Sequence, residues 1–221
     1  MVTNRIKQIL KHKTKVGLIG VVGFMSLILA GCSKPVSEGP QFIPSVQNTQ
    51  TAWHTHQSIL KNLTSWEASG VIGIRVNNKG ESANVFWKVK SKNDYVIQIY
   101  GTAGLGAISI TGRPDGSVIF KDSNGKETYA KNVEDLMQKR LGWSLPVQGL
   151  YYWGRGLPAP IASKELSLNR YGLMSSIAQS GWEIEYYDYK MYNNTYPLPS
   201  RITLHQGNLN IKLVIKSWSV D

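Results

Sequence analysis

From Trp66 onward, apolar residues recur at every second position in short segments, and turn residues separate these segments. Alternation with this period places one set of side chains on one face of a β-strand. Two such sets are Ala83, Val85, Trp87 and Val89, followed by Tyr95, Ile97 and Ile99. The later expected strands cover residues 107–111, 118–121, 127–130, 166–171, 173–179, 182–189, 201–205 and 209–218. Because the segments are short and closely spaced, the pattern favours antiparallel pairing over βαβ units.

Turn residues punctuate the strands with identifiable chemistry. Asn77–Gly80 and Gln206–Asn208 are typical of hairpin turns. Arg113–Gly116 combines a proline, which fixes φ, with a glycine that tolerates positive φ. A sheet of about ten strands tends to curl or to close. The sequence therefore predicts a mainly β fold with one long, curled antiparallel sheet.

Three helices are expected beside this sheet. Residues 51–63 carry apolar and aromatic side chains at helical spacing. Asn132 is a typical N-cap for a second helix and Gly142 a typical terminator. Pro146 suits the start of a third helix that reaches about Trp153. We expect the second and third helices, which are inserted midway along the strands, to pack across the concave face of the sheet.

Some strands carry apolar residues in both phases. Such strands are either covered on both faces or have an inner face lined for an apolar ligand, and the sequence does not separate these alternatives. The pairs concerned are Phe86 with Trp87, Val96 with Ile97, and Tyr186 with Tyr187.

The N-terminus has the three parts of a secretory signal. Its basic segment contains Arg5, Lys7, Lys11, Lys13 and Lys15. The next 15 residues, Val16–Ala30, are almost wholly apolar. As a helix they would span about 22 Å, less than the roughly 30 Å of a bilayer core. This pattern predicts a cleaved signal peptide rather than a membrane span.

The sequence Leu29-Ala30-Gly31-Cys32 at the end of this segment resembles the bacterial lipobox. The resemblance implies cleavage before Cys32, diacylglycerol on its thiol and N-acylation of the new amino terminus. Ser33 resembles the residue at this position in lipoproteins sorted to the outer membrane. We therefore expect a signal peptide at 1–31, a lipidated flexible tether at 32–50 and one folded domain at 51–221.

Charge and composition exclude several classes of function. Loss of the five basic leader residues lowers the formal net charge from +11 to +6, and the remaining basic residues are scattered, so nucleic-acid binding is not expected. Cys32 is the only cysteine, which excludes an intrachain disulfide. His54 and His56 diverge on a helix, so no metal site is expected. Glu183 and Glu185 lack a supporting pocket signal, so catalysis and cofactors other than the covalent lipid are not expected.

Five blocks of the chain resemble the LolB family of outer-membrane lipoprotein receptors. These blocks are Trp66–Gly70, Leu141–Val147, Tyr152–Pro158, Gly181–Tyr186 and Pro199–Trp218. The resemblance implies an incomplete, unclosed antiparallel β-barrel with helices over its opening and an apolar cavity inside. It also implies a monomer that accepts acylated lipoproteins from the periplasmic carrier LolA and inserts them into the outer membrane.

The resemblance points to two kinds of site residue. The family carries an exposed leucine between its third and fourth strands, and this position falls on Leu105, where the chain has Gly104 instead of the usual proline. Leu105 is expected to contact lipid; the alternative is that it folds back onto the core. Candidates for the lining of an acyl cavity, with ordinary core packing as the alternative, are Trp87, Tyr95, Ile97, Ile99, Leu136, Trp153 and Tyr186.

Two other functions are compatible with a curled sheet on a lipid anchor. A structural or assembly lipoprotein of the envelope would use an exposed sheet edge to bind another protein. An envelope hydrolase would need a nucleophile and a base in one pocket, and the Gly-x-Ser-x-Gly motif that could supply the nucleophile is missing from the sequence.

Overall fold

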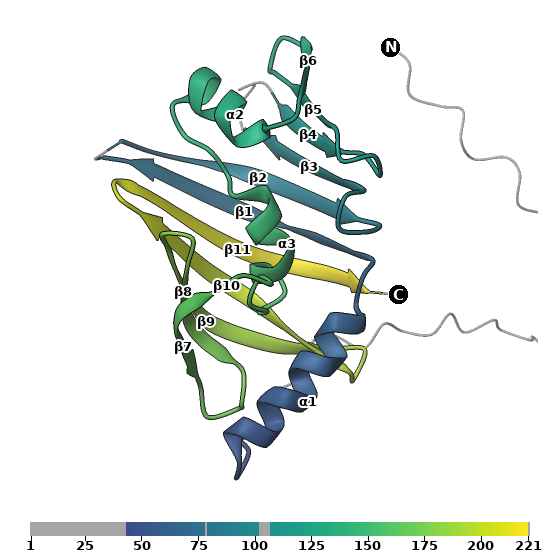
Figure 1. Ribbon diagram of the computed structural model, residues 1–221, viewed down its shortest axis with the longest axis vertical. Coiled ribbons are helices and arrows are strands. Elements are labelled where there is room, and N and C mark those ends of the chain that lie inside the picture. The colour runs from purple at the N-terminus through teal and green to yellow at the C-terminus, as the bar shows by residue number, and fades with distance from the viewer. Residues whose placement is uncertain (1–42, 78, 102–106, 221) are drawn as a thin grey trace, which may run out of the picture. The chain divides into compact units, whose positions relative to one another are not determined.

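The computed structural model describes residues 43–77, 79–101 and 107–220. These residues form one antiparallel sheet of 11 strands and three helices (Figure 1). The strands are β1 Trp66–Val76, β2 Lys79–Val89, β3 Tyr95–Tyr100, β4 Ile108–Gly112, β5 Val118–Lys121, β6 Glu127–Ala130, β7 Ser163–Leu168, β8 Met174–Gln179, β9 Trp182–Tyr192, β10 Tyr196–Gln206 and β11 Leu209–Val220. The helices are α1 Thr49–Asn62, α2 Val133–Leu141 and α3 Val147–Trp153.

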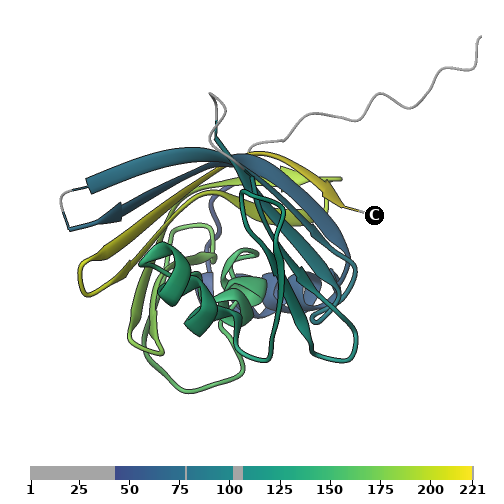
Figure 2. The same ribbon diagram turned by 90° about the horizontal axis from the view of Figure 1, so that it is seen from above.

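The strand order is β6-β5-β4-β3-β2-β1-β11-β10-β9-β8-β7. The first and last strands of the chain, β1 and β11, therefore pair at the centre of the sheet, with Trp66 opposite Val220. Within the described part of the chain, the outer strands β6 and β7 pair with one neighbour each and not with one another. The sheet curls but stays open, which confirms the predicted unclosed antiparallel barrel (Figure 2).

The helices begin and end where the sequence predicts, within two residues. The Asn132 side chain accepts a hydrogen bond from the Asp135 amide at 3.1 Å, and Gly142 ends α2 with a φ of 76°. The Asn48 side chain caps α1 in the same way through the Thr51 amide. All three helices lie on the concave side of the sheet, as expected for α2 and α3 (Figure 2).

Several strand boundaries differ from the sequence prediction. Strand β7 begins at Ser163 and not at Leu166, and β9 ends at Tyr192 and not at Tyr189. Residues 166–171 were expected as one strand, but β7 ends at Leu168. The Asn169 side chain accepts hydrogen bonds from the Tyr171 and Leu173 amides and so closes a turn there. In contrast, β10 begins at Tyr196, ahead of the predicted Arg201. Its prolines are tolerated because β10 pairs with β11 only from Arg201 onward.

The folded part of the chain starts before the predicted boundary at residue 51. Ile43 is buried, and the Val46 amide donates to the Arg170 carbonyl at 3.2 Å. The end of the expected tether therefore contacts the domain at Ile43 and Val46, whereas Pro44, Ser45 and Gln47 are exposed.

The buried residues form one core, on the side of the sheet that the helices cover. On the other phase of the strands, Phe86 and Val96 are half-buried and Tyr187 is exposed. At Tyr187, the apolar residues on both faces of the strand therefore do not indicate a second layer that covers the outer face of the sheet.

Candidate functional site

The concave face of the sheet carries rows of apolar side chains that continue from strand to strand. Residues in one row are direct cross-strand partners, so their side chains lie side by side. One row runs from β11 to β5 and consists of Trp218, Ala68, Trp87, Ile97, Ile110 and Phe120. The other half of the sheet adds a row of Ile177, Ile184, Leu204, Ile211 and Ile74. Together the rows form a wide apolar surface beneath the helices.

The structure brings all seven predicted cavity residues into this one core. Tyr95 and Leu136 are partly buried and pack against the core cluster. The others are buried, and they are Trp87, Ile97, Ile99, Trp153 and Tyr186. Their convergence is a finding, whereas their contact with an acyl chain stays a prediction.

Helix α3 is fixed to the sheet through its last residues. The Trp153 indole N–H donates to the Gln179 Oε1 at 2.8 Å, and the Tyr186 hydroxyl donates to the Trp153 carbonyl at 2.9 Å. Gly154 follows directly, and a Cβ atom there would lie 2.8 Å from the Trp87 ring. The end of α3 therefore rests on the middle of the first apolar row.

Three tryptophans form a cluster at this row, two of them members of it and the third, Trp66, beside it. The Trp66 ring packs edge-to-face against Trp87 and Trp218, with centroid distances of 4.6 and 5.1 Å. The Trp218 indole N–H donates to the Pro199 carbonyl at 3.0 Å. The indole nitrogens of Trp66 and Trp87 are buried and have no acceptor within the described residues. Buried donors normally find a partner, so this part of the core has capacity for a further acceptor.

Arg155 is the one buried charged residue of the described core and had no predicted role. Its side chain is 1 % exposed and donates to the carbonyls of Tyr151, Leu60 and Leu63. Desolvation by burial lowers its pKa, although the Tyr151 ring lies 4.2 Å from the guanidinium. No ion pair with a carboxylate is found for it in the described segments. The sequence does contain a signal for this buried charge, namely a lone arginine between two glycines in an apolar stretch.

Buried tyrosines keep the interior uncharged. Burial and, to a lesser extent, the nearby Glu134 carboxylate raise the pKa of Tyr95 to about 12. Burial raises the pKa values of Tyr186 and Tyr189 well above their usual value. These phenols stay neutral at physiological pH. Tyr186 and Tyr189 act as hydrogen-bond donors, Tyr189 to the Met174 carbonyl at 2.8 Å.

Two predicted site residues, Cys32 and Leu105, lie outside the described residues. Leu105 belongs to the connection between β3, which ends at Tyr100, and β4, which begins at Ile108. The position of that connection in the chain is the one that the family resemblance implies.

Neither a metal cluster nor a membrane-spanning helix is found in the described part. No group of three or more His, Cys, Asp or Glu side chains there is arranged to hold a metal ion. No described helix is both long and apolar enough to cross a bilayer.

An open antiparallel sheet with an apolar concave face under helices defines a class of proteins with a sheltered apolar interior. The sequence profile of the family described as outer membrane lipoprotein LolB matches residues 64–218. The chain belongs to the LolB family, which confirms the resemblance drawn from its sequence blocks.

Relatives from several bacteria carry the same description, outer-membrane lipoprotein LolB. The Francisella tularensis SCHU S4 protein is 38% identical over 176 residues, which cover 80% of this chain and 82% of the relative. The Pseudomonas syringae B728a protein is 39% identical over 166 residues, with 75% and 80% covered. The Stutzerimonas stutzeri A1501 protein is 37% identical over 194 residues, with 88% and 91% covered. The protein is accordingly an outer-membrane lipoprotein, and its family description is not that of an enzyme.

Solved structures are similar at lower identity. A LolA superfamily protein from Nitrosomonas europaea is 11% identical with a TM-score of 0.49, and the match covers 80% of this chain and 94% of that one. A putative outer-membrane lipoprotein-sorting protein domain from Vibrio parahaemolyticus is 8% identical with the same TM-score, with 79% and 94% covered.

Proposed function

We propose that this protein accepts acylated lipoproteins from the periplasmic carrier LolA, shelters their acyl chains on its concave face and inserts them into the outer membrane. The apolar rows beneath the helices support this function, because they offer a continuous surface for hydrocarbon chains. Each methylene group removed from water contributes about 0.8 kcal/mol, so long acyl chains require shelter outside a bilayer. Transfer needs no nucleotide when each successive site, and finally the membrane, binds the chains more tightly.

The observation that carries the proposal is the continuous row of apolar side chains across the concave face. Two buried indole N–H groups without acceptors among the described residues, on Trp66 and Trp87, lie at this row. The acylated end of a lipoprotein carries ester and amide carbonyls next to its hydrocarbon chains, and these carbonyls are suitable acceptors. Entry of the chains requires α2 or α3 to shift from the concave face, where α3 now packs on Trp87 through Gly154.

We propose that Cys32 carries the lipid anchor and that Leu105 acts at the delivery step. Cys32→Ala is expected to abolish both lipidation and cleavage, because the thiol is the acceptor of diacylglycerol in the lipobox. Mass spectrometry of the mature amino terminus tests this assignment. An unmodified Cys32 in the wild-type protein would overturn it.

A binding experiment tests the proposed function through a matched pair of variants. The mature protein is titrated with a fluorescent acyl ester and with a fluorescent hydrocarbon of equal length. Trp87→Phe removes an unpaired N–H, whereas Trp218→Phe removes one already bonded to the Pro199 carbonyl. We expect Trp87→Phe to weaken ester binding about five-fold more than hydrocarbon binding, since one hydrogen bond contributes about 1 kcal/mol. Trp218→Phe should affect both probes equally. Failure of the wild-type protein to bind either probe would refute the proposal.

One observation favours a second candidate function, an assembly lipoprotein that binds another protein. Within the described residues, β6 and β7 are sheet edges, each with one free side. An added strand from a partner would pair there. This function predicts that proline substitutions in β7 abolish partner capture while both acyl probes fail to bind.

A further inference from the structure

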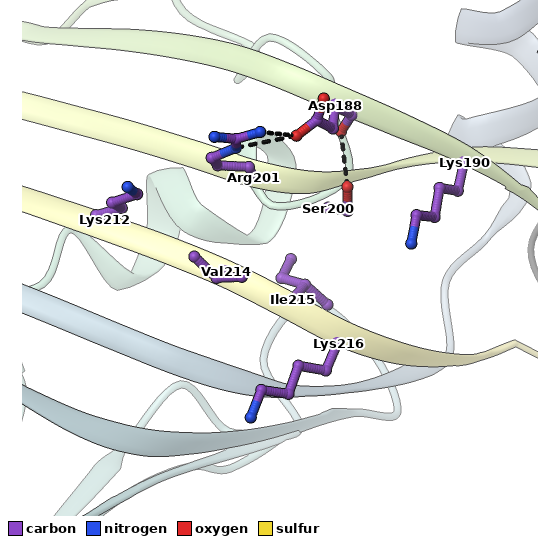
Figure 3. A pocket seen from close by; sticks show the side chains of 8 residues that line it. All are labelled: Asp188, Lys190, Ser200, Arg201, Lys212, Val214, Ile215 and Lys216. Atoms are coloured by element: carbon purple, nitrogen blue, oxygen red, sulfur yellow. Dashed lines mark hydrogen bonds and ion pairs between the residues drawn. The ribbon is translucent and has the colours of Figure 1, made fainter.

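The outward face of β9, β10 and β11 contains a pocket that the proposed transfer function does not use. Its volume is about 440 Å³, which is within the size range of small-molecule sites. Eight residues line it, namely Asp188, Lys190, Ser200, Arg201, Lys212, Val214, Ile215 and Lys216 (Figure 3). We call it the β9–β11 pocket.

The pocket forms where β10 and β11 separate. Their pairing extends from Gln206 and Leu209 only as far as Arg201 and Val214. Beyond this point the Trp218 indole reaches across and donates to the Pro199 carbonyl at 3.0 Å. The Trp218 indole thus connects β10 and β11 on the buried side of the sheet, and the pocket lies over the same gap on the outward side.

All three strands are irregular beside this opening, and the extra residues of β10 and β11 line it. Lys216 is an extra residue in β11, because Ser217 pairs with Ser69 and Ile215 with Gly70. In the pairing of β9 with β10, Ser200 is an extra residue of β10 and Tyr187 is an extra residue of β9. Bulges of this kind redirect side chains and are frequent beside functional sites.

Gly70 shows how closely the strands approach at the β11 bulge. A Cβ atom at Gly70 would lie 2.1 Å from the Val214 carbonyl oxygen. Only a residue without a side chain fits there, so the bulge that places Lys216 beside the pocket depends on this glycine.

The lining combines positive charge with a small apolar floor. Arg201 pairs with Asp188, which is the only acidic residue in the lining. Lys190, Lys212 and Lys216 form no ion pair with the described carboxylates. Ile215, which is 7 % exposed, and Val214, which is 37 % exposed, supply the apolar surface, and the polar Ser200 beside them is 8 % exposed. Three lysines around an apolar floor suit an anionic group that is attached to something apolar.

We propose that the β9–β11 pocket binds the phosphate-bearing headgroup of an anionic phospholipid in the membrane that holds the protein. The protein is an outer-membrane lipoprotein, so such headgroups are within reach of its anchored domain. The lysines supply the charge that phosphate needs, and Val214 contacts the glycerol region. An open pocket of this size, ringed by three lysines, fits one headgroup better than the broad face of an acidic protein. The bound headgroup would orient the domain on the bilayer independently of any cargo.

Lysine footprinting of the mature, lipid-anchored protein in nanodiscs tests the proposal without cargo or carrier. The nanodiscs contain either phosphatidylglycerol or zwitterionic phosphatidylcholine, and mass spectrometry follows acetylation of each lysine. We expect Lys190, Lys212 and Lys216 to react about five-fold more slowly in phosphatidylglycerol, since each lysine near an anionic surface gains about that factor. The exposed lysines Lys126 and Lys131, outside the pocket, are the internal controls. Equal protection of pocket and control lysines would overturn the proposal.

Two further arms separate the source of the anion. Full protection of the pocket lysines by inorganic phosphate in phosphatidylcholine nanodiscs would refute a lipid headgroup site. If the pocket lysines became protected in phosphatidylcholine only after an acidic protein was added, that result would refute the headgroup site in favour of a protein partner. Loss of the protection when salt is raised from 0.1 to 1 M supports it, because the screening length falls from about 10 to 3 Å.

Matched variants complete the test. In the double variant Lys212→Gln and Lys216→Gln, Lys190 should be acetylated in phosphatidylglycerol nanodiscs as fast as it is in phosphatidylcholine nanodiscs. Lys126→Gln with Lys131→Gln removes the same charge elsewhere and should leave Lys190 protected. An identical effect of both pairs would show that only net charge matters and would overturn a specific pocket.

Discussion

The Nη1 atom of Arg155 lies 3.0 Å from the carbonyl oxygen of Leu60 and joins the C-terminal end of α1 to the segment after α3. The same guanidinium also donates to the Leu63 carbonyl and, through Nε, to the Tyr151 carbonyl at 3.0 Å. The carbonyls at a helix end have no intrahelical partner and need one when buried. Arg155 thus satisfies carbonyls from two helices that are far apart in the sequence.

Replacement of this arginine should lower stability strongly. We expect Arg155→Ala to reduce the free energy of unfolding by about 2–4 kcal/mol, because it leaves buried carbonyls unpaired and opens a cavity. Urea unfolding followed by tryptophan fluorescence measures the change. Arg140→Ala, at an exposed position on α2, should change it by less than about 0.5 kcal/mol. Equal effects of the two substitutions would contradict the role assigned to Arg155.

Two glycines of the sheet and helix layers should differ in their tolerance of a methyl group. Gly154→Ala should destabilise the protein by roughly 1–3 kcal/mol, since the Cβ would lie 2.8 Å from the Trp87 ring and 2.9 Å from the Leu150 carbonyl. Gly73→Ala should be nearly neutral, because its nearest neighbour would be 3.9 Å away. Thermal unfolding of both variants provides the comparison. A tolerated Gly154→Ala would mean that α3 does not rest on Trp87.

Alkaline conditions should weaken the fold through its buried phenols. The pKa of Tyr95 is about 12 in the folded protein against 10.0 as the ordinary value. Between these values the folded state retains a proton that the unfolded state loses, so the free energy of unfolding falls as the pH rises above 10. Tyr95→Phe removes this ionisation, so the free energy of unfolding of this variant should fall less steeply with pH.

The measurement is the urea midpoint from pH 8 to 11.5. Tyr129→Phe, at an exposed tyrosine, is the control and should follow the wild-type curve. Tyr186 and Tyr189 retain their own raised pKa values, so some alkaline sensitivity should remain in Tyr95→Phe. A Tyr95→Phe curve that coincides with the wild type would contradict this account.

Leu105→Glu should separate acceptance of cargo from its delivery. Its neighbours Gly104 and Gly106 offer little packing surface, so the substitution should leave folding and transfer from the carrier nearly unchanged. Transfer from this protein to liposomes should fall, because a charged side chain must be desolvated to enter lipid. Radiolabelled lipoprotein followed through the two steps measures this, with Leu105→Ile as the control. Loss of both steps together with a large fall in Tm would instead identify Leu105 as a core residue.

The sequence determined the local elements because their signals lie within a few residues. Period-two alternation located the strands, and Asn132 and Gly142 located the ends of α2. The family resemblance rested on five blocks of the chain and was correct. The seven predicted cavity residues also meet in one core. Strand alternation assigns five of them to a face, and the helical spacing of apolar residues does so for Leu136, whereas Trp153 ends the short helix α3.

Only the tertiary structure decided which distant segments meet. The pairing of β1 with β11 places Trp218 in contact with Trp66, which also contacts Trp87 on β2, and two of the three indole N–H groups have no acceptor among the described residues. The bonds of Arg155 to Leu60 connect residues 95 positions apart, a distance that no local pattern encodes. The bulge at Lys216 likewise arises from register against Gly70 on another strand. Local propensity acts over a few residues, whereas register, burial and unpaired donors depend on the packing of the whole chain.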